Sequence, residues 1–386
     1  MAPPPPPPEL IADTVAEILL LVPPDEPAHL IRASAVCKPW RRILTDPAFL
    51  RRYREFHGTP PLLGFIDNYS SAMGGDPSFV PATAASPFPQ PWHACRGSVV
   101  LDCRHGRVLL HMGAAGRDLL VWDPVTGEGR GLRKPAGSPS GAFSAAVLCA
   151  AAGAGCNHLD CHGGPFLVVL VGGHNSTLAR VYSSETGAWS APTSITDGGI
   201  VSVEPKRGVL VGNAIYFSLT TGLILMYDFG SNHSSWIKKP HTPDVAILMA
   251  MEDDSLGVAS IRHSSLHLWS MKNVDANGNA RWGQCRVIGL ETMLPGGSPF
   301  TRADVIGFAE GVGTIFVRTD VGVFPIDLKS RSMRKSCEHV NCYRTIPFLS
   351  FYTPGLVCGG QNVNNTFAYG NCNLQLLYVY VVLVFG

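Results

Sequence analysis

Apolar positions recur with a helical period over residues 9–57. The first run with this spacing contains Leu10, Ile11, Val15, Ile18, Leu19 and Val22, as expected for a helix with one buried face. Prolines at 23, 24 and 27 end it, because proline lacks an amide donor and restricts the residue before it. A second run contains Leu30, Ile31, Ser34, Val36, Cys37 and Trp40, and a third contains Phe49, Leu50, Tyr53 and Phe56. The third run follows Asp46 and Pro47, a pair typical of a helix start, so we predict a small all-α module of three helices.

The pattern changes after residue 58, where short apolar runs rich in β-branched and aromatic residues alternate with turn residues. A unit of successive strands repeats, and its anchor positions are Trp122, Tyr182, Tyr227, Trp269 and Pro325. These anchors lie about 40–60 residues apart, a period typical of a β-propeller. Each blade is a twisted sheet that must stack on its neighbours to bury both faces. We therefore predict an all-β domain over residues 58–354, a β-propeller that is either complete or incomplete, with a β-sandwich as the main alternative.

Composition agrees with a turn-rich β domain and excludes two classes of partner. The chain of 386 residues contains 41 glycines and 31 prolines. Together they make up about 19% of the chain, compared with an average of ~12% for these two residues. Its formal net charge is +1, so no basic face for a nucleic-acid partner is expected. No apolar run reaches the ~18 residues of a spanning helix, so we expect no membrane partner.

Cysteine usage and the N-terminus point to a cytoplasmic or nuclear protein. The N-terminus lacks a basic region, and Asp13 and Glu17 interrupt its apolar stretch, so we expect no secretory leader. The 11 cysteines are then expected to be reduced and mostly buried.

The two ends of the chain differ from the regions between them. Residues 1–8 are proline-rich and are expected to form a disordered tail with polyproline II character. Residues 355–386 contain no charged side chain, and Leu376–Phe385 is a continuous apolar, β-prone run with the features of an aggregation-prone strand. Three interpretations remain open for this segment: a closing strand covered on both faces, a foreign tail from an altered reading frame, or a membrane-surface segment.

Two clusters of cysteine and histidine are candidate zinc sites. The first contains Cys149, Cys156, His158, Cys161 and His162, residue types that bind zinc. Because its spacing is not that of a standard zinc knuckle and the segment is rich in Ala and Gly, we interpret these groups as loop side chains without a role. The second contains His93, Cys95, Cys103, His105 and His111, which strand alternation would distribute over two faces. We therefore predict no metal and no cofactor.

No group of residues resembles a catalytic site. Nothing combines a nucleophile with a base and an orienting group, and no nucleophile elbow is present. The expectation is a protein that is not an enzyme and has no catalytic residues.

The helical module resembles the F-box of the large plant families that carry a β-rich domain behind it. The resemblance rests on three segments, namely Glu9-Leu10-Ile11 to Val22-Pro23, Ser34 to Arg41 with Val36-Cys37-Lys38-Pro39-Trp40, and Asp46-Pro47-Ala48-Phe49. The β domain is similar to F-box-associated and kelch-like propellers.

This resemblance implies a substrate receptor of a cullin-based, SCF-type ubiquitin ligase. The F-box would bind a Skp-type adaptor and, through it, a cullin, while the propeller would hold a target protein of unknown identity. Carried over to this sequence, the adaptor contacts or their supporting core are Leu10, Ile11, Ile18, Leu19, Pro23, Val36, Cys37, Trp40, Pro47 and Phe49.

A basic fringe on the module has two interpretations. Its members are Lys38, Arg41, Arg42, Arg51, Arg52 and Arg54. They form either an ordinary solvated face or rim charges that steer an acidic partner.

Two other functions compete with the ligase receptor. One is a non-degradative interaction scaffold with a vestigial F-box. The other is a propeller enzyme or a sugar-binding protein.

Overall fold

The computed structural model describes residues 11–68, 76–83, 97–112, 118–135, 143–151, 156–173, 177–195, 202–242, 245–275, 279–291, 293, 302–333, 342 and 344–353. The predicted proline-rich tail, Leu10, and the C-terminal segment over 355–386 lie outside this range. No helix in the described part of the chain is long and apolar enough to span a membrane.

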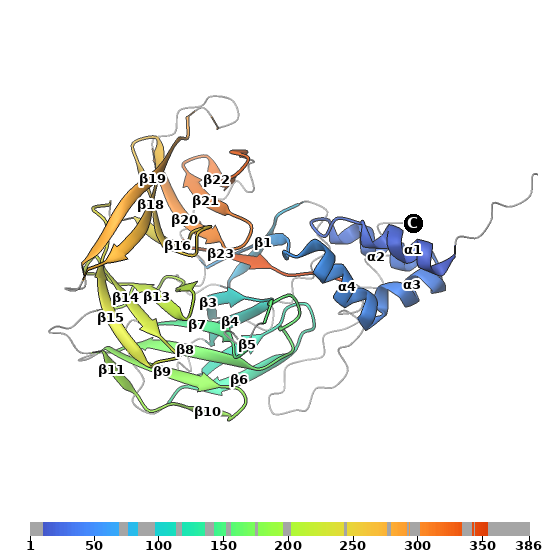
Figure 1. Cartoon of the computed structure of the whole chain (residues 1–386), viewed down its shortest axis with the longest axis horizontal. Coiled ribbons are helices and arrows are strands. Elements are labelled where there is room, and N and C mark those ends of the chain that lie inside the picture. Colours follow the sequence, from blue (N-terminus) through green and yellow to red (C-terminus); the bar gives the residue numbers. More distant parts are fainter. Residues whose placement is uncertain are drawn as a thin grey trace, which may run out of the picture.

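Four helices form the N-terminal module, where the sequence predicted three (Figure 1). They are α1 (Ala12–Leu20), α2 (Pro27–Val36), α3 (Lys38–Thr45) and α4 (Pro47–His57). The predicted second helix is divided at Cys37, which has an extended backbone with φ −159° and ψ 162°. Pro39 lies in the first turn of α3, where a proline is tolerated although it could not continue α2.

The start of α4 confirms the predicted cap. Asp46 has an extended backbone and accepts a hydrogen bond from the Ala48 amide at 3.2 Å. Pro47 follows at the first helical position, and Gly58 ends the helix with φ +69°. The four helices enclose a small core that includes Leu19, Leu30, Leu44, Phe49 and Tyr53.

Six antiparallel sheets follow and form the blades of a β-propeller (Figure 1). One blade contains β3 (Ser98–Arg104), β4 (Arg107–Met112), β5 (Asp118–Trp122) and β6 (Gly129–Arg133). A second blade contains β7 (Phe143–Cys149), β8 (Phe166–Gly172), β9 (Thr177–Ser183), β10 (Ala188–Trp189) and β11 (Thr193–Ile195). The third blade contains β12 (Val209–Val211), β13 (Ala214–Ser218), β14 (Leu223–Asp228) and β15 (His233–Lys238). The fourth contains β16 (Ala246–Ala250), β17 (Leu256–Arg262), β18 (Ser265–Val274) and β19 (Ala280–Gly289). The fifth contains β20 (Ala303–Ala309), β21 (Thr314–Thr319) and β22 (Gly322–Asp327), and the sixth contains β1 (Leu62–Asp67), β2 (Ser78–Pro81) and β23 (Thr345–Leu349).

The sixth blade closes the ring, which the sequence did not establish. Its strand order is β2-β1-β23, so the first and last strands of the domain pair in one sheet, with Phe65 opposite Pro347. Gly64 of β1 allows a close approach, because an added Cβ would lie 2.3 Å from the Val80 carbonyl oxygen. The described residues thus form a closed propeller, and the β-sandwich alternative is wrong.

The five predicted anchors occupy equivalent positions in five blades. Each of Trp122, Tyr182, Tyr227, Trp269 and Pro325 lies on the third strand of its blade. The period in the sequence therefore reported the blade repeat correctly.

Outer-strand tryptophans connect neighbouring blades. The Trp189 indole N–H donates to the Arg133 carbonyl at 2.8 Å, and the Trp282 indole N–H donates to the Lys238 carbonyl at 2.8 Å. In both cases the acceptor belongs to the preceding blade. This bond satisfies the only donor of the indole and fixes the spacing of adjacent sheets.

A buried ion-pair network joins several blades near the inner strands. Asp102 is fully buried, pairs with Arg104, and accepts from the Arg207 Nε at 2.8 Å and the Val147 amide at 2.9 Å. Glu310 adds a carboxylate 3.2 Å from Arg207 and 3.3 Å from Arg104. Burial alone would lower the pKa of Arg207, but the carboxylates of Glu310 and Asp102 raise it above its ordinary value. The blades therefore meet around charges that remain paired.

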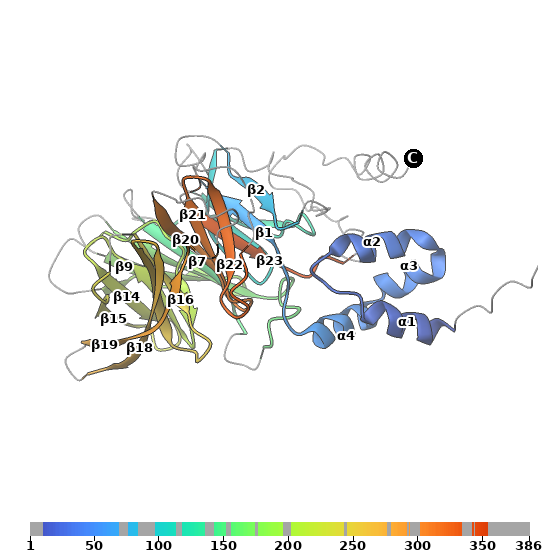
Figure 2. The ribbon, with the colours of Figure 1, turned by 90° about the horizontal axis from the view of Figure 1, so that it is seen from above.

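The helical module lies at one face of the propeller (Figures 1 and 2). Near it are the β3–β4 turn and the β7–β8 connection, since Gly106 and His162 share one pocket with Arg54 of α4. An added Cβ on Gly311, in the β20–β21 turn, would also lie 3.9 Å from Thr59. Because strands of a blade alternate in direction, turns between second and third strands lie at the opposite face.

Candidate partner-binding surface on the helical module

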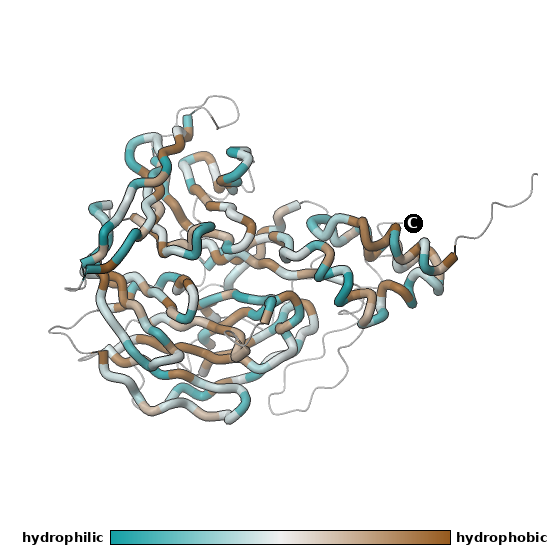
Figure 3. The backbone as a smooth tube through the Cα atoms, viewed as in Figure 1, coloured by the Kyte–Doolittle hydropathy of each residue, from teal (hydrophilic) through white to brown (hydrophobic). Residues whose placement is uncertain are grey.

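The helical module exposes a disproportionate share of large apolar side chains. Nine are exposed in the described part of the chain, and five of them belong to the module: Ile11, Ile18, Leu21, Val36 and Phe56. Figure 3 shows apolar segments on the helices as well as along the blades. Exposed apolar groups gathered on a small element mark an interaction site.

Helix α1 leaves two apolar residues exposed beside those that it buries. Val15, Leu19 and Leu20 are buried in the module's core. Ile11, the N-cap residue, and Ile18 are seven residues apart, about two helical turns, and lie at the edge of the stripe that contains the buried Val15. Their side chains are 73% and 49% exposed, so the described residues do not cover this edge.

The structure divides the predicted adaptor-contact set into three groups. Ile11, Ile18, Pro23, Val36 and Pro47 are exposed, Cys37 and Trp40 are partly buried, and Leu19 and Phe49 belong to the core. Leu10 lies outside the described residues. The prediction omitted the exposed Leu21 and Phe56. Phe56 belongs to the third apolar run, and Leu21 lies between Leu19 and Val22 of the first.

The basic fringe loses one of its members in the structure. Lys38, Arg41, Arg42 and Arg51 are exposed, and Arg52 forms a 2.8 Å ion pair with Glu17 of α1. Arg54 is instead buried and pairs with Asp160 from the β7–β8 connection. Burial lowers the pKa of Arg54 and the Asp160 carboxylate opposes that shift. Arg54 is therefore a junction residue between module and propeller and not a rim charge.

Apolar contacts complete this junction. Leu159, next to Asp160, packs against the core of the helical module, as does Phe351, which follows β23. The Phe351 ring stands edge-on to Tyr53 with centroids 6.2 Å apart. The Tyr53 hydroxyl donates to the Val22 carbonyl at 2.7 Å. Side chains from both regions thus share one core, which fixes the module on the propeller.

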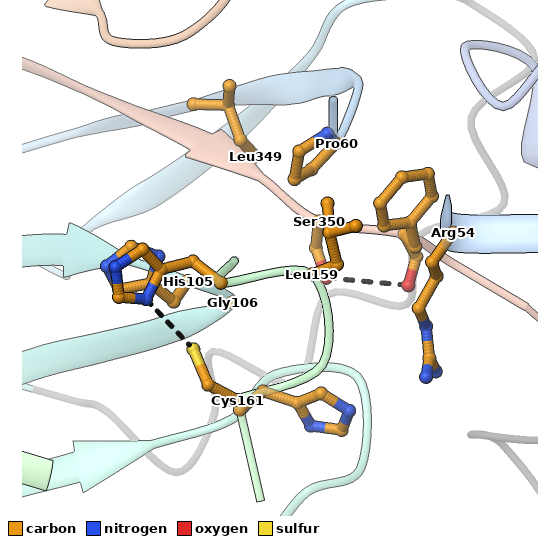
Figure 4. Close-up of a pocket in the computed structure, with 11 residues that line it drawn as sticks. Arg54, Pro60, His105, Gly106, Leu159, Cys161, Leu349 and Ser350 are labelled. Atoms are coloured by element: carbon orange, nitrogen blue, oxygen red, sulfur yellow. Dashed lines mark hydrogen bonds between the residues drawn. The ribbon is translucent and has the colours of Figure 1, made fainter. Parts of the chain in front are cut away.

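A pocket at the junction is lined by cysteine and histidine side chains (Figure 4). Among them are His105 from the β3–β4 turn and His158 and Cys161 from the β7–β8 connection. The His105 and His158 rings stack with centroids 4.2 Å apart. Burial, followed by the nearby His158, lowers the pKa of His105 to about 3, and burial together with the neighbouring thiols of Cys149 and Cys156 raises the pKa of Cys161 to about 12. Sequence reasoning had placed His105 and His158 in separate clusters.

A second groove contains residues that could be mistaken for a catalytic triad. It has a volume of about 430 Å³, and Ser184, His162 and Asp123 all line it. The His162 Nδ1 faces Asp123 at 3.1 Å, and its Nε2 faces Asp160 at 3.4 Å. The Ser184 hydroxyl accepts from the Phe166 amide at 2.8 Å. Because both ring nitrogens face carboxylates, neither is positioned to take a proton from Ser184.

Comparisons with solved structures found folds with low similarity. The WD40 domain of SCAP from fission yeast is 14% identical with a TM-score of 0.38, and the match covers 61% of this chain and 50% of that one. The mitotic checkpoint complex contains a chain that is 13% identical with a TM-score of 0.35, covering 62% and 76% respectively. The chain thus spans half the length of the first of these structures.

A family model gives the more informative comparison. A search of curated proteins found no match. The family model "F-box protein AT5G49610-like, beta-propeller" matches residues 99–356, which include five blades except for the first residue of β3, and the closing strand β23. The match begins after the helical module and extends over more than half of the chain. The chain therefore belongs to the F-box protein AT5G49610-like β-propeller family.

Proposed function

We propose that this chain is a substrate-recognition subunit of a cullin-based, SCF-type ubiquitin ligase. Its helical module is the F-box and binds a Skp-type adaptor, which joins it to a cullin, and its propeller binds a target protein. The family description supports a role in substrate recognition. The observation that carries the adaptor assignment is the set of five exposed apolar side chains on the helical module.

The exposed set has the chemistry of a protein-binding surface. Ile11, Ile18 and Val36 are at least 49% exposed, and an apolar partner that covered them would gain about 1.5–3 kcal/mol for each fully buried side chain. The exposed Lys38, Arg41 and Arg51 add positive charge to the same module. Charges at such a rim mainly increase the association rate with an acidic partner.

The propeller is suited to hold a target without chemistry of its own. The module contacts turns between first and second strands, and the described residues leave the opposite face free for a target. Val321, between β21 and β22, and Val245, before β16, are exposed apolar residues in connections at that face. Holding a target beside a ligase acts by raising its effective concentration. In this proposal the chain has no catalytic residues and acts in the cytoplasm or nucleus.

Adaptor binding is tested with variants on the exposed surface. The double variant Ile18→Asp/Val36→Asp places charges at two of the exposed apolar positions and should weaken binding to a purified Skp-type adaptor at least about 100-fold, as expected for the loss of two hot spots. The matched control is Val274→Asp/Val287→Asp, which changes two exposed valines of the propeller. Titration calorimetry with the full chain measures both. Equal affinity of wild type and the F-box double variant would refute the assignment.

A second measurement separates the ligase subunit from a scaffold with a vestigial F-box. If the chain works as a ligase subunit, affinity purification recovers the adaptor and a cullin together, and both disappear with Ile18→Asp/Val36→Asp. Recovery of the adaptor without a cullin would favour the scaffold.

A further inference from the structure

Three cysteines and one histidine converge where the helical module meets the propeller. Cys149 ends β7, and Cys156, His158 and Cys161 belong to the connection that leads to β8. One ligand atom from each of the four residues lies within 4.8 Å of all the others. Cys149 is buried and the other three are partly buried. From this geometry we infer a structural zinc site of the Cys₃His type.

The distances within the cluster fit a tetrahedral ion. Zinc lies about 2.3 Å from cysteine sulfur and about 2.0 Å from histidine nitrogen. A regular tetrahedron with these bonds separates two sulfurs by about 3.8 Å and a sulfur from a nitrogen by about 3.6 Å. The Sγ atoms of Cys149 and Cys156 are 3.9 Å apart. The Cys161 Sγ is 3.7 Å from the His158 Nδ1, a contact drawn as a dashed line at Cys161 in Figure 4. Two of the six distances among the ligand atoms thus match the tetrahedron, and the other four are no longer than 4.8 Å.

The backbone around the ligands is arranged for this cluster. His158 has a left-handed backbone with φ +57°, a conformation that costs energy for most residues and persists where the surroundings impose it. In this conformation its amide donates to the Cys156 Sγ at 3.4 Å. An N–H···S bond of this kind stabilises a thiolate ligand, because it favours the charged sulfur.

Neighbouring side chains balance the charge and position the loop. A divalent ion with three thiolates and a neutral imidazole carries a net charge of −1, after the three thiol protons have left to solvent. The guanidinium of Arg107 is buried and donates to the carbonyls of Cys161, at 2.6 Å, and of Gly164. It therefore supplies a compensating positive charge and holds the last ligand in place. The His105 ring stacked on His158 fixes the orientation of that imidazole.

The site also has a structural consequence for the junction. Leu159 and Asp160 stand between the ligands His158 and Cys161, and they contact the module's core and Arg54 of α4. Zinc that binds both flanking ligands fixes the two intervening residues. The ion thereby sets the position of the helical module on the propeller, independently of any adaptor.

A disulfide is the competing use of these thiols. The 3.9 Å between the Cys149 and Cys156 sulfurs is far longer than the about 2.05 Å of an S–S bond. A disulfide would also leave Cys161 and His158 without a ligand role.

The metal content of the full chain tests the site. The protein, purified under reducing conditions from zinc-supplemented cells, should contain about one zinc per chain by inductively coupled plasma mass spectrometry. Cys156→Ser/Cys161→Ser should reduce this content at least about tenfold, since even outer partners of a metal ligand contribute about 10–100-fold in affinity. The control Cys37→Ser/Cys285→Ser changes two cysteines outside the cluster and should keep the wild-type content.

A spectroscopic test does not depend on the folding of any variant. Wild-type chain reconstituted with Co²⁺ should show the intense visible absorption of a tetrahedral ion together with sulfur-to-cobalt charge transfer. Zinc-free wild-type protein, an octahedral cobalt spectrum, or a Cys149–Cys156 disulfide in protein isolated without reductant would each overturn the site.

Limited proteolysis tests the consequence for the junction. Chelation of zinc from the wild-type chain should increase cleavage in the connection over residues 58–61 several-fold, and added zinc should reverse the increase. Cleavage that is unchanged by the chelator, in protein shown to have lost its zinc, would overturn the role in module docking.

Discussion

The helical module and the propeller bury their side chains in different ways. In the propeller, the largest fully buried groups include Phe65, Phe217, Phe316 and Phe348, and the buried Asp102 is paired with arginines from two segments. In the module, five large apolar side chains remain exposed beside a small core. The propeller therefore buries its large apolar side chains within itself, whereas the module leaves apolar surface exposed.

Size explains this difference. Four short helices present more apolar surface than they can enclose, because the buried fraction of a chain rises with its length. A closed ring of six blades has no free inner edge, and each sheet covers its neighbours. The two regions consequently predict opposite effects for mutations: loss of stability in the propeller, and loss of binding in the module.

The largest effect is expected for the closing strand. Phe348 of β23 is 1% exposed and meets Phe79 edge-on, with ring centroids 6.2 Å apart. Phe348→Ala should lower the free energy of unfolding by about 3–5 kcal/mol, the usual cost of removing a buried aromatic ring. Thermal unfolding followed by circular dichroism in the near ultraviolet measures it.

A change below about 1 kcal/mol for Phe348→Ala would mean that β23 does not close the ring. Val287→Ala is the control, because Val287 is 50% exposed on the outer strand β19. Its effect should stay within about 0.5 kcal/mol.

The next effect concerns the paired charges at the inner strands. Asp102→Asn should destabilise the chain by about 3 kcal/mol, because it leaves the buried Arg104 and the partly buried Arg207 with only Glu310 as a charged partner. Asp102 also accepts hydrogen bonds from the backbone amides of Cys103 and Val147. The NH₂ group of an asparagine cannot accept a hydrogen bond, so one of these bonds would be lost. Chemical denaturation monitored by tryptophan fluorescence gives the value.

The exposed pair of Glu252 and Lys329 is the control for Asp102→Asn. Its side chains are 77% and 74% exposed, so Glu252→Gln should change stability by less than about 0.5 kcal/mol. Equal effects of the two substitutions would show that the inner network does not hold the blades together.

Repetition made the blades predictable from the sequence. The anchors Trp122, Tyr182 and Tyr227 recur because each third strand packs in an equivalent environment, and a periodic chain shows a periodic structure. Closure has no such signal, since β1 and β23 pair across almost the whole domain. The break between α2 and α3 depends on one extended residue, Cys37, which helical periodicity alone does not reveal.

The junction could not be predicted for a related reason. His105 and His158 belong to different blades, and they stack only because the β3–β4 turn and the β7–β8 connection meet at one face. Arg54 looked like a surface charge of an amphipathic helix, and only the fold provides Asp160 as its partner. The spacing of apolar residues along the chain predicts which face of a helix or strand is buried. Contacts between loops that are distant in the sequence depend on the complete fold and cannot be predicted from that spacing.

A smaller effect is expected where the two regions meet. Asp160→Asn removes the charged partner of Arg54, whose side chain is 6% exposed, and should cost about 1–3 kcal/mol. The module should also detach more often, with faster proteolysis over residues 58–61. Glu17→Gln, which breaks the exposed pair with Arg52, should leave the cleavage rate unchanged. Equal rates for wild type and Asp160→Asn would show that apolar contacts alone fix the module.

The smallest effect on stability sharpens the comparison within one helix. Ile18 and Leu19 are neighbours on α1, but Ile18 is 49% exposed and Leu19 is 2% exposed. Leu19→Ala should therefore destabilise the module by about 2–5 kcal/mol, while Ile18→Ala should change its stability by less than about 0.5 kcal/mol. Hydrogen exchange of the α1 amides measures the local free energy for both. If Ile18→Ala destabilises α1 as strongly as Leu19→Ala, then Ile18 belongs to the core and is not available to a partner. If Ile18→Ala leaves stability unchanged and Ile18→Asp abolishes adaptor binding, then Ile18 serves recognition while its neighbour Leu19 serves folding.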